Sequence, residues 1–514
     1  MSDLERLARE IYGFGITDVF GIPGSGQTLE LLDCLEQYPV KFHLAHFEGA
    51  AAIMAGVAGR LSGRPGVAVS IKGPGLANMI PGLALCYLER FPLVAIAEAY
   101  HAQAPPSQAH KRMNHAALVE AVTKGRRYLA ERGPGFTEMA EWAAAEIPGP
   151  VLLELAGGKT ERECGVPPAT CPAGADLVKY ISQAKRPLVI AGTLALRYGW
   201  PDQLNRLSIP VFSTVAAKGV VNEHLPHAAG VYTGAGLELT PEKNVLPMAD
   251  LIVGIGLHPN EVLAARPFHC PAVNIYPVDD PGCAAAFNFA ATAPPREAAA
   301  VFDALARQSW GLEAVQASRH KLEEKLLGGP FLPARAFPII EDAFQGAVRL
   351  VLDTGNFCTV GEHVWRSIGG DRFLCSGQGR YMGVSLPMGL AASLYDRQIP
   401  TVVVAGDGGI GPFLAEMKIA VQNRLPLILI LMTDGYFASI RGRALQDRLT
   451  EKPLTIAAPS WLSVMEGFRL RAERVETAEA LHRVLAEWNI HEGPMYIEIP
   501  FPSTPYQWML RGIR

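Results

Sequence analysis

The sequence predicts an α/β protein built from three doubly wound parallel sheets. Short and nearly continuous apolar runs alternate with helical stretches, and runs of this kind are buried on both faces of a parallel sheet. A chain of 514 residues also has room for about three domains of ordinary size. The expected strands include residues 67–71, 93–97, 151–155, 188–191, 251–255, 402–405, 427–432 and 496–499, and the expected helices include 28–37 and 48–61.

Two internal similarities assign these elements to domains. Residues 90–97 resemble residues 424–431, and residues 149–155 resemble residues 493–499 at nearly the same separation. The first and last thirds are therefore expected to share a topology, and the middle third to form a separate domain. Two stretches rich in proline or glycine mark the boundaries. They lie at 164–175 and 328–330 and divide the chain into predicted domains at 1–165, 176–328 and 330–514.

The composition limits the classes of function. Hydrophobic residues make up 49% of the chain and charged residues 19%, which is typical of a packed globular protein. The net charge of −4 provides no basic field for nucleic acid or an anionic membrane. No apolar run reaches the roughly 18–20 residues that cross a bilayer, and the N-terminus lacks the features of a signal peptide. We therefore expect a cytoplasmic protein with no nucleic-acid or membrane partner, and its 8 scattered cysteines are expected to be free thiols.

The strongest chemical signal lies in the last third. One expected strand runs into a Gly-Asp-Gly-Gly motif, and the next ends at Thr433-Asp434-Gly435. Because parallel strands end at the same edge of a sheet, Asp407 and Asp434 can converge there. Glycines let a phosphate approach the backbone, and carboxylate oxygens suit Mg²⁺. A tight turn capped by the aspartate is the alternative for the motif alone. The pattern predicts a metal-diphosphate site that includes Gly406, Asp407, Gly408, Gly409 and Asp434.

A second signal lies in the first third, at Glu48. This residue follows a strand-like stretch at 42–46 and precedes a helix start of small residues at 49–56. An ordinary first-turn glutamate, favoured by the helix dipole, is the alternative. A carboxyl group with apolar neighbours is suited to proton transfer, so Glu48 is a candidate catalytic residue.

With these motifs the chain resembles the thiamine diphosphate enzymes of the pyruvate decarboxylase, benzoylformate decarboxylase and acetolactate synthase superfamily. The resemblance extends over essentially the whole chain. It implies pyrimidine-binding, central and diphosphate-binding domains, in that order, with thiamine diphosphate and Mg²⁺ as cofactors. The further motifs that carry it are Gly21-Ile-Pro-Gly-Ser-Gly26, His46-Phe-Glu-Gly-Ala-Ala51, Gly73-Pro-Gly-Leu-Ala-Asn78, Ala216-Ala-Lys-Gly-Val-Val221 and Gly379-Arg-Tyr-Met-Gly-Val-Ser-Leu-Pro387.

The resemblance implies roles for residues on both sides of the cofactor. Glu48 would bind N1′ of the aminopyrimidine and promote the imino tautomer that removes the thiazolium C2 proton. Met382 would be the apolar wedge that keeps the cofactor bent, with plain core packing as the alternative. In this superfamily the residues corresponding to Glu48 and to the Gly-Asp-Gly motif come from different subunits. A homodimer or homotetramer is therefore implied.

The implied metal site departs from the family pattern at one position. Asp407, Asp434 and the backbone carbonyl of Tyr436 would hold Mg²⁺ on the diphosphate. The family motif usually ends in Asn-Asn or Asp-Asn, whereas this chain has Thr433-Asp434. The extra charge should strengthen metal binding and repel the diphosphate.

Several residues are candidates for the substrate pocket. Ser25 stands where relatives carry a catalytic aspartate or serine, although a turn hydroxyl is the alternative. Lys72 stands where benzoylformate decarboxylase-like chains carry a histidine, although a solvated surface lysine is the alternative. The guanidinium groups of Arg380, Arg441 and Arg443 suit carboxylate, sulfonate or phosphonate. Arg380 is also a predicted cofactor-binding residue. We hypothesise a substrate or acceptor with a second anionic group.

Other acid-base and cofactor candidates are less specific. The histidines at 101, 110, 115 and 258 could serve as acid-base groups, and none is favoured. In the middle third, residues 254–260 do not show the G-x-G-x-x-G fingerprint of a flavin or dinucleotide site, so flavin is not expected.

The implied activity is non-oxidative decarboxylation of a 2-oxo acid, with or without transfer of the carbanion to a carbonyl acceptor. The altered metal motif motivates an alternative, a cofactor-binding but catalytically silent subunit or regulatory relative. A dinucleotide-dependent oxidoreductase is a third hypothesis, but the sequence shows neither its glycine fingerprint nor its ribose-binding acid.

Overall fold

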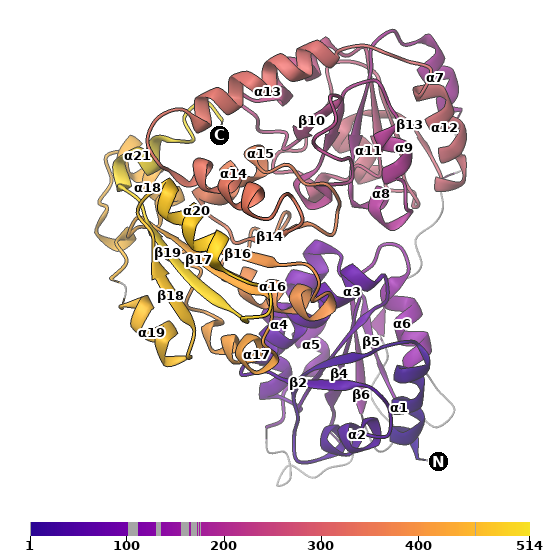
Figure 1. Cartoon of the computed structure of the whole chain (residues 1–514). Coiled ribbons are helices and arrows are strands. Elements are labelled where there is room, and N and C mark those ends of the chain that lie inside the picture. The colour runs from indigo at the N-terminus through magenta and orange to yellow at the C-terminus, as the bar shows by residue number, and fades with distance from the viewer. Residues whose placement is uncertain are drawn as a thin grey trace. The chain divides into compact units, whose positions relative to one another are not determined.

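A computed structural model of the chain describes residues 2–100, 111–129, 135–155, 164–165, 172, 174, 176–457 and 459–513. Three mainly parallel sheets with interleaved helices organise it, which confirms the predicted fold class (Figure 1). The chain forms two compact units. The first contains Met1–Pro168, Leu386–Gln398 and Pro412–Leu425, and the second contains Ala169–Ser385, Ile399–Gly411 and Pro426–Arg514.

The first sheet has seven strands in the order β2-β1-β3-β4-β6-β5-β7. Neighbouring strands are parallel except for the antiparallel pair β5 and β7. Strands β3, β4 and β6 are buried throughout, which explains their nearly continuous apolar sequences. The strands are β1 (Asp18–Ile22), β2 (Lys41–Leu44), β3 (Gly66–Ser70), β4 (Leu93–Glu98), β5 (Gly125–Tyr128), β6 (Pro150–Leu155) and β7 (Cys164–Gly165). The helices are α1 (Asp3–Gly13), α2 (Gln27–Leu35), α3 (Glu48–Ser62), α4 (Pro74–Glu89), α5 (His115–Val119) and α6 (Phe136–Ala144).

The last sheet repeats this topology in the order β15-β14-β16-β17-β19-β18. When strands are numbered along each domain, the first six of the first sheet and these six both read 2-1-3-4-6-5, which confirms the predicted similarity. The strands are β14 (Arg349–Leu352), β15 (Phe373–Cys375), β16 (Thr401–Gly406), β17 (Leu427–Thr433), β18 (Arg471–Arg474) and β19 (Met495–Pro500). The helices include α14 (Pro333–Ala343), α15 (Asn356–Val364), α16 (Ser385–Tyr395), α17 (Met417–Asn423), α18 (Ala438–Gln446), α19 (Trp461–Gly467), α20 (Ala478–Glu487) and α21 (Ser503–Trp508).

The central sheet has a different order, β10-β9-β8-β11-β12-β13, which reads 3-2-1-4-5-6 along the chain. All its paired strands are parallel. The strands are β8 (Pro187–Ala191), β9 (Val211–Ser213), β10 (Ala228–Val231), β11 (Leu251–Ile255), β12 (Ala272–Ile275) and β13 (Phe289–Ala293). The helices are α7 (Leu177–Gln183), α8 (Thr193–Arg197), α9 (Pro201–Asn205), α10 (Pro241–Val245), α11 (Pro281–Phe287), α12 (Ala298–Leu305) and α13 (Leu312–Leu327).

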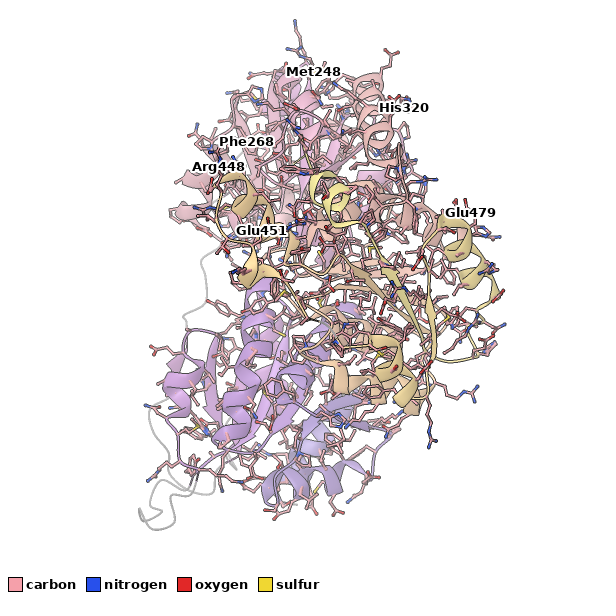
Figure 2. The ribbon with its side chains drawn as sticks, turned by 90° about the vertical axis from the view of Figure 1, so that its left-hand side faces the viewer. Met248, Phe268, His320, Arg448, Glu451 and Glu479 are labelled. Atoms are coloured by element: carbon pink, nitrogen blue, oxygen red, sulfur yellow. The ribbon has the colours of Figure 1, made fainter. Side chains whose placement is uncertain are left out.

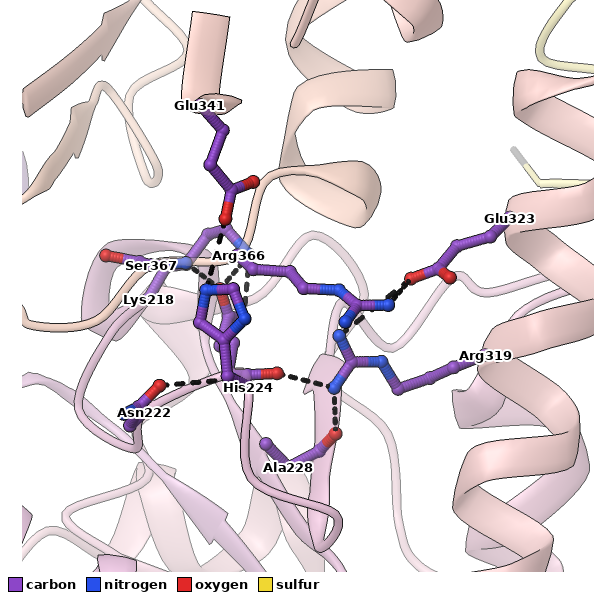
Figure 3. Close-up of polar contacts among 10 residues, drawn as sticks. Lys218, Asn222, His224, Ala228, Arg319, Glu323, Glu341, Arg366 and Ser367 are labelled. Carbon is purple, nitrogen blue, oxygen red and sulfur yellow. Dashed lines mark hydrogen bonds and ion pairs between the residues drawn. The ribbon is translucent and has the colours of Figure 1, made fainter. Parts of the chain in front are cut away.

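Buried polar contacts join the central and last sheets within the second unit (Figure 3). Lys218 is buried, and its Nζ lies 2.6 Å from Glu223 Oε2. The same oxygen accepts a hydrogen bond from the Ser367 backbone N–H at 2.8 Å. Arg319 Nη1 donates to the backbone oxygen of Glu223 at 2.7 Å. Because a buried lysine needs a paired acid, the motif at 216–221 has a structural role at this junction. The domain boundaries themselves stay predictions.

Two expectations from composition concern the described residues. Among them, no helix is both long and apolar enough to span a membrane. The cysteines whose side chains are described are free thiols, as predicted. The side chains of Cys164 and Cys171 lie outside the described residues.

Candidate active site

The two predicted aspartates converge at the carboxyl edge of the last sheet. Asp407 directly follows β16, and Asp434 directly follows β17, its neighbour in the sheet. Asp407 Oδ1 accepts a hydrogen bond from Thr433 Oγ1 at 2.5 Å. Asp407 Oδ2 accepts from the backbone N–H groups of Asp434 at 3.0 Å and Gly435 at 3.2 Å. The first aspartate therefore holds the second motif in place, which a cap for its own turn would not do.

Asp434 has surroundings that suit a metal ligand. Its Oδ1 accepts from the Tyr436 backbone N–H at 3.3 Å, but Oδ2 is buried without a hydrogen-bond partner among the described residues. Burial and the nearby charge of Asp407 raise the pKa of Asp434 to about 6. A divalent cation would relieve this repulsion and satisfy the orphaned oxygen, so the residues fit Mg²⁺.

The remaining metal ligands would not be further acids. The described residues contain no group of three or more His, Cys, Asp or Glu side chains that could hold a metal ion. A cation at Asp407 and Asp434 would therefore complete its shell with backbone oxygen, water or phosphate oxygen. Mg²⁺ usually binds in this way, through one or two carboxylates together with the phosphates of its partner.

Met382 lies over the glycine-rich turn that follows β16. A Cβ added to Gly408 would be 2.7 Å from Met382 Sδ and 2.4 Å from the Phe437 ring, so these side chains would have to shift to admit one. Met382 is 45% exposed. Exposure of this size contradicts the plain core-packing alternative and leaves an apolar side chain free to contact a ligand at the turn.

Asp353 is a site residue that the sequence reasoning missed. It directly follows β14 and is 1% exposed. Both of its carboxylate oxygens accept from the Gly383 backbone N–H at 2.8 Å, and Oδ1 accepts from Thr354 N–H at 2.9 Å. Burial raises its pKa to about 7. A Cβ on Gly409 would lie 1.8 Å from Asp353 Oδ2. Asp353 thus holds the segment that carries Met382. Its position directly after a buried strand is the sequence feature that could have identified it.

Glu48 begins α3 in the first unit and is 6% exposed. Its Oε2 accepts a hydrogen bond from Asn78 Nδ2 at 3.1 Å. A Cβ added to Gly75 would lie 3.2 Å from Glu48 Oε1. The sequence motifs at 46–51 and 73–78 therefore meet at this carboxylate. The small residues at the start of α3 let α4 approach closely.

Glu416 positions the start of α3, and sequence reasoning missed it. This residue also belongs to the first unit and is fully buried. Its Oε1 accepts from the backbone N–H groups of His46 at 2.8 Å and Phe47 at 3.1 Å, directly before Glu48. Burial raises the pKa of Glu416. No local pattern could show this contact, because about 370 residues separate the partners.

Ser25 and Lys72 are accessible in the first unit. Ser25 is exposed in the loop after β1. Lys72 is partly buried, and its Nζ lies 5.7 Å from the centre of the Tyr100 ring, a cation–π contact. Their predicted roles toward substrate stay predictions.

The three arginines have different surroundings. Arg441 Nε donates to Glu451, labelled in Figure 2, at 2.6 Å, and its guanidinium lies 3.9 Å from the centre of the Tyr436 ring. Arg443 has a side chain that is 81% exposed and pairs with Asp447 at 3.1 Å. Arg380 pairs with the buried carboxylate of Glu362.

Two of the four histidine candidates lie within the described residues. His115 is buried, lies 2.7 Å from Glu154 through Nδ1, and accepts a hydrogen bond from the Gly73 N–H at Nε2. His258 Nε2 lies 3.1 Å from Asp280 Oδ2. Both have structural partners. The other two, His101 and His110, lie outside the described residues.

In the central domain a carboxylate occupies the place where this sheet order usually binds a phosphate. Glu261 is 1% exposed and accepts hydrogen bonds from Thr193 N at 2.8 Å, Thr193 Oγ1 at 2.6 Å and Thr214 Oγ1 at 2.8 Å. Thr193 begins α8 directly after the first strand of this sheet. Because that turn is the usual phosphate position, Glu261 disfavours a nucleotide or flavin phosphate there.

The second unit has two carboxylates beside a glycine-rich turn, and the first unit has a buried glutamate at a helix start. Both features are those expected of an α/β enzyme that uses a diphosphate cofactor. Three family models match the chain: the thiamine pyrophosphate enzyme N-terminal TPP binding domain at residues 4–118, the central domain at 175–279 and the C-terminal TPP binding domain at 353–499. The chain therefore belongs to the thiamine pyrophosphate enzymes, whose cofactor is also called thiamine diphosphate. The predicted family is confirmed.

Similar proteins within this family indicate the kind of reaction. The chain is 26% identical to an acetolactate synthase of Bacillus subtilis over 95% of this chain and 90% of that one. It is 26% identical to a catabolic acetolactate synthase of Raoultella terrigena over 96% and 94% of the two chains. It is also 26% identical to a probable 2-ketoarginine decarboxylase of Pseudomonas aeruginosa over 85% and 83%. These similarities confirm the predicted class, a thiamine diphosphate-dependent decarboxylase or carboligase, and give no support to a silent subunit.

Proposed function

We propose that this protein releases carbon dioxide from a 2-oxo acid without oxidation, and then either protonates the remaining fragment or joins it to a carbonyl acceptor. The pairing of Asp407 with Asp434 at the edge of the last sheet carries the proposal, because Oδ2 of Asp434 is buried without a partner among the described residues. That arrangement suits a cation on a diphosphate. Similarity to acetolactate synthases and to a probable 2-oxo acid decarboxylase supports the choice of reaction.

Most of the predicted site residues have a task in this proposal. Thiamine diphosphate supplies a ring that accepts the electron pair released on decarboxylation. Glu48 holds the aminopyrimidine N1′ and exchanges a proton there, while Asn78 keeps its carboxylate in position. Asp407, Asp434 and the Tyr436 backbone carbonyl bind Mg²⁺. The exposed side chain of Met382 supports the cofactor from one face.

The remaining groups act on substrate or cofactor phosphate. Gly406, Gly408 and Gly409 give the diphosphate access to the backbone. Ser25 orients the substrate carboxylate, and Lys72 attracts the substrate anion.

The proposed assembly is a homodimer or homotetramer in the cytoplasm. Glu48 of one subunit would work with Asp407 of another, as the resemblance to the superfamily implies. Sedimentation of the cofactor-loaded protein would measure the subunit number, and a monomer with full activity would contradict this part of the proposal.

We also propose that the substrate or the acceptor carries a second anionic group. Of the basic residues considered for it, Arg441 is held by Glu451 and the Tyr436 ring. Arg443 is more available, because its side chain is largely exposed and its acidic partner Asp447 is itself 45% exposed. An exposed ion pair costs little to replace with a ligand contact.

The decisive experiment is a mass-spectrometric screen of 2-oxo acids with the purified protein, thiamine diphosphate and Mg²⁺. Each acid is tested alone and with an aldehyde or 2-oxo acid acceptor. A product lighter than the 2-oxo acid by one carbon dioxide identifies a decarboxylase. A product larger than that, formed with the acceptor, identifies a carboligase. A protein that binds the cofactor in calorimetry but converts no acid supports the alternative of a silent subunit.

A further inference from the structure

A cavity of 640 Å³ lies in the second unit. It is formed by the first turns of α15, the middle of α18, the end of α21 and the chain after α21. Its volume falls within the usual range of small-molecule sites. Neither Asp407 nor Asp434 lines it, so it is separate from the metal position.

Arginines are the only charged residues that line the cavity, among those that the structure describes. Arg380, Arg443 and Arg511 line it, and none of the described residues that line it is acidic. The acids that pair with two of these arginines, Glu362 and Asp447, lie outside the lining. Guanidinium groups form paired hydrogen bonds with carboxylate, sulfonate and phosphonate oxygens. In a chain with a net charge of −4, such a concentration of positive charge would attract an anion selectively.

Two residues that line this cavity have buried polar atoms without hydrogen-bond partners among the described residues. Arg380 Nε and Nη2 are buried without hydrogen bonds to the described residues, and so is Oε1 of Gln507, which is 8% exposed. Arg380 also has a φ of 48°, a left-handed conformation that is unfavourable for arginine. Buried polar atoms in proteins are almost always hydrogen-bonded. Arg380 and Gln507 therefore have unused hydrogen-bonding capacity in the wall of the cavity.

The cavity borders the segments that hold the proposed cofactor site. Thr354, which lines it, follows Asp353 and donates from Oγ1 to the Tyr381 backbone oxygen at 2.8 Å. Tyr381 lies between Arg380 in the cavity and Met382 over the glycine turn. Helix α18, which contributes Arg443, begins four residues after Asp434. A substrate that reaches from the cofactor toward this cavity would therefore pass along short, well-held segments.

We infer that this cavity binds a terminal oxyanion of the 2-oxo acid or its acceptor, at the end opposite the reacting carbonyl. Arg443 and Arg511 contact the anion, and Arg380 is the buried cation beneath it. The inference rests on the proposed function, since it assigns the substrate class of that same site. A rival occupant is the diphosphate of the cofactor itself, because α15 begins at the cavity wall.

A binding experiment tests the inference without turnover. The protein saturated with thiamine diphosphate and Mg²⁺ is titrated calorimetrically with glutarate, 3-sulfopropanoate, 3-phosphonopropanoate and pentanoate. We expect at least one of the dianions to bind at least tenfold more tightly than pentanoate, and the best of the three identifies the preferred oxyanion. Arg443→Met and Arg511→Met should each weaken that dianion about 10–100-fold. Arg483→Met, at an exposed position on α20 outside the lining, is the matched control and should bind like the wild type.

Two results would overturn the inference. Equal affinity for pentanoate and all dianions would show that the cavity does not select an anion. A loss of thiamine diphosphate affinity in Arg443→Met and Arg511→Met would assign the cavity to the cofactor. Wild-type protein that binds the dianion but converts no 2-oxo acid would instead contradict the proposed function and leave the anion site in place.

Turnover gives a second, independent measure. In the active holoenzyme, Arg443→Met should lower kcat/KM for 2-oxoglutarate more than for 2-oxohexanoate, which has no distal anionic group, by about tenfold or more. An equal loss for both substrates would mean that Arg443 acts on the reaction itself and not on the distal anion.

Discussion

The first six strands of the first sheet have the same order as the six strands of the last sheet, but the two sheets carry their acids in different places. In the last sheet, Asp407 and Asp434 follow the two strands β16 and β17. The corresponding strands of the first sheet are β3 and β4, and the acid there is Glu98, at the end of β4. Its Oε1 accepts from Thr28 N at 3.2 Å and Thr28 Oγ1 at 2.8 Å. Glu98 is satisfied within the protein, whereas Asp434 has a buried oxygen without a partner in the described chain.

At the helices that precede β3 and β16, the acid is in the first domain and not in the last. Helix α3 of the first domain begins with Glu48, whereas α16, its counterpart in the last domain, begins with Ser385. A shared topology therefore supplies equivalent sheet edges. In the proposed function, the choice of residue at each edge determines whether that edge would exchange a proton or bind a cation.

The largest effect on activity is expected from Glu48→Gln. This variant keeps the size and shape of the side chain but removes the acid that distinguishes the start of α3 from the start of α16. The amide cannot exchange a proton with the cofactor, so kcat should fall about 10²–10⁴-fold. Product formation measured by mass spectrometry checks this, with circular dichroism as the test of folding. Full activity in a folded variant would remove Glu48 from the mechanism.

The two domains should also differ in how their stability depends on pH. Asp353 follows β14, whereas Pro23 and no acid follows β1, the corresponding strand of the first sheet. Burial raises the pKa of Asp353 to about 7 from an ordinary value of 3.8. The folded protein keeps this proton up to about pH 7, whereas the unfolded chain releases it near pH 4. The cofactor-free protein should therefore lose stability as pH rises between these values, by at most roughly 4 kcal/mol.

The variant Asp353→Asn isolates this effect. Asp434 has a raised pKa of about 6 and contributes in the same direction, but it is present in both proteins. The difference in Tm between wild type and variant, followed from pH 4 to 7.5, therefore reports Asp353 alone. Parallel Tm profiles would show that this carboxyl group does not titrate in that range.

Two variants, one at the edge of the last sheet and one at the same edge of the first sheet, test whether only the acid of the last sheet binds Mg²⁺. Asp407→Asn removes a negative charge from the proposed metal site. Mg²⁺ affinity in the presence of thiamine diphosphate should therefore fall by at least about 10–100-fold, a loss seen even for groups that only support a ligand. Glu98→Gln should leave Mg²⁺ affinity unchanged. Calorimetry measures both, and equal losses would contradict the assignment.

The smallest expected effect distinguishes two glycines of one turn. Gly409→Ala places a Cβ 1.8 Å from the buried Asp353 Oδ2 and should cost about 1–3 kcal/mol of unfolding free energy. Gly411→Ala meets nothing within 4 Å and should change stability by less than about 1 kcal/mol. Urea denaturation measures both variants. Similar values would mean that the turn relaxes around the added methyl group.

Much of the site was predictable because its residues follow buried strands. The apolar runs located β16 and β17 to within a residue or two, and parallel strands place their following residues at one edge. Asp407 and Asp434 could therefore be paired from the sequence alone. Asp353 follows a buried strand in the same way and was missed, because no second motif accompanied it.

Other contacts depend on packing between distant elements. Glu416 binds the backbone directly before Glu48, although the two partners are about 370 residues apart in the sequence. The local pattern of apolar residues cannot predict a contact of this kind. Arg380, Arg443 and Arg511 line one cavity although they come from separate segments. The partial exposure of Met382 also depends on how its loop sits over Gly408.

The sequence by itself determined the α/β class, the repeated topology and the edge at which the two aspartates meet, since these follow from the local periodicity of buried strands. Only the tertiary structure decided which acids are satisfied internally and which remain available. That difference depends on the hydrogen-bond donors that folding brings to each carboxylate: Thr28 satisfies Glu98, while one buried oxygen of Asp434 receives no donor from the described chain.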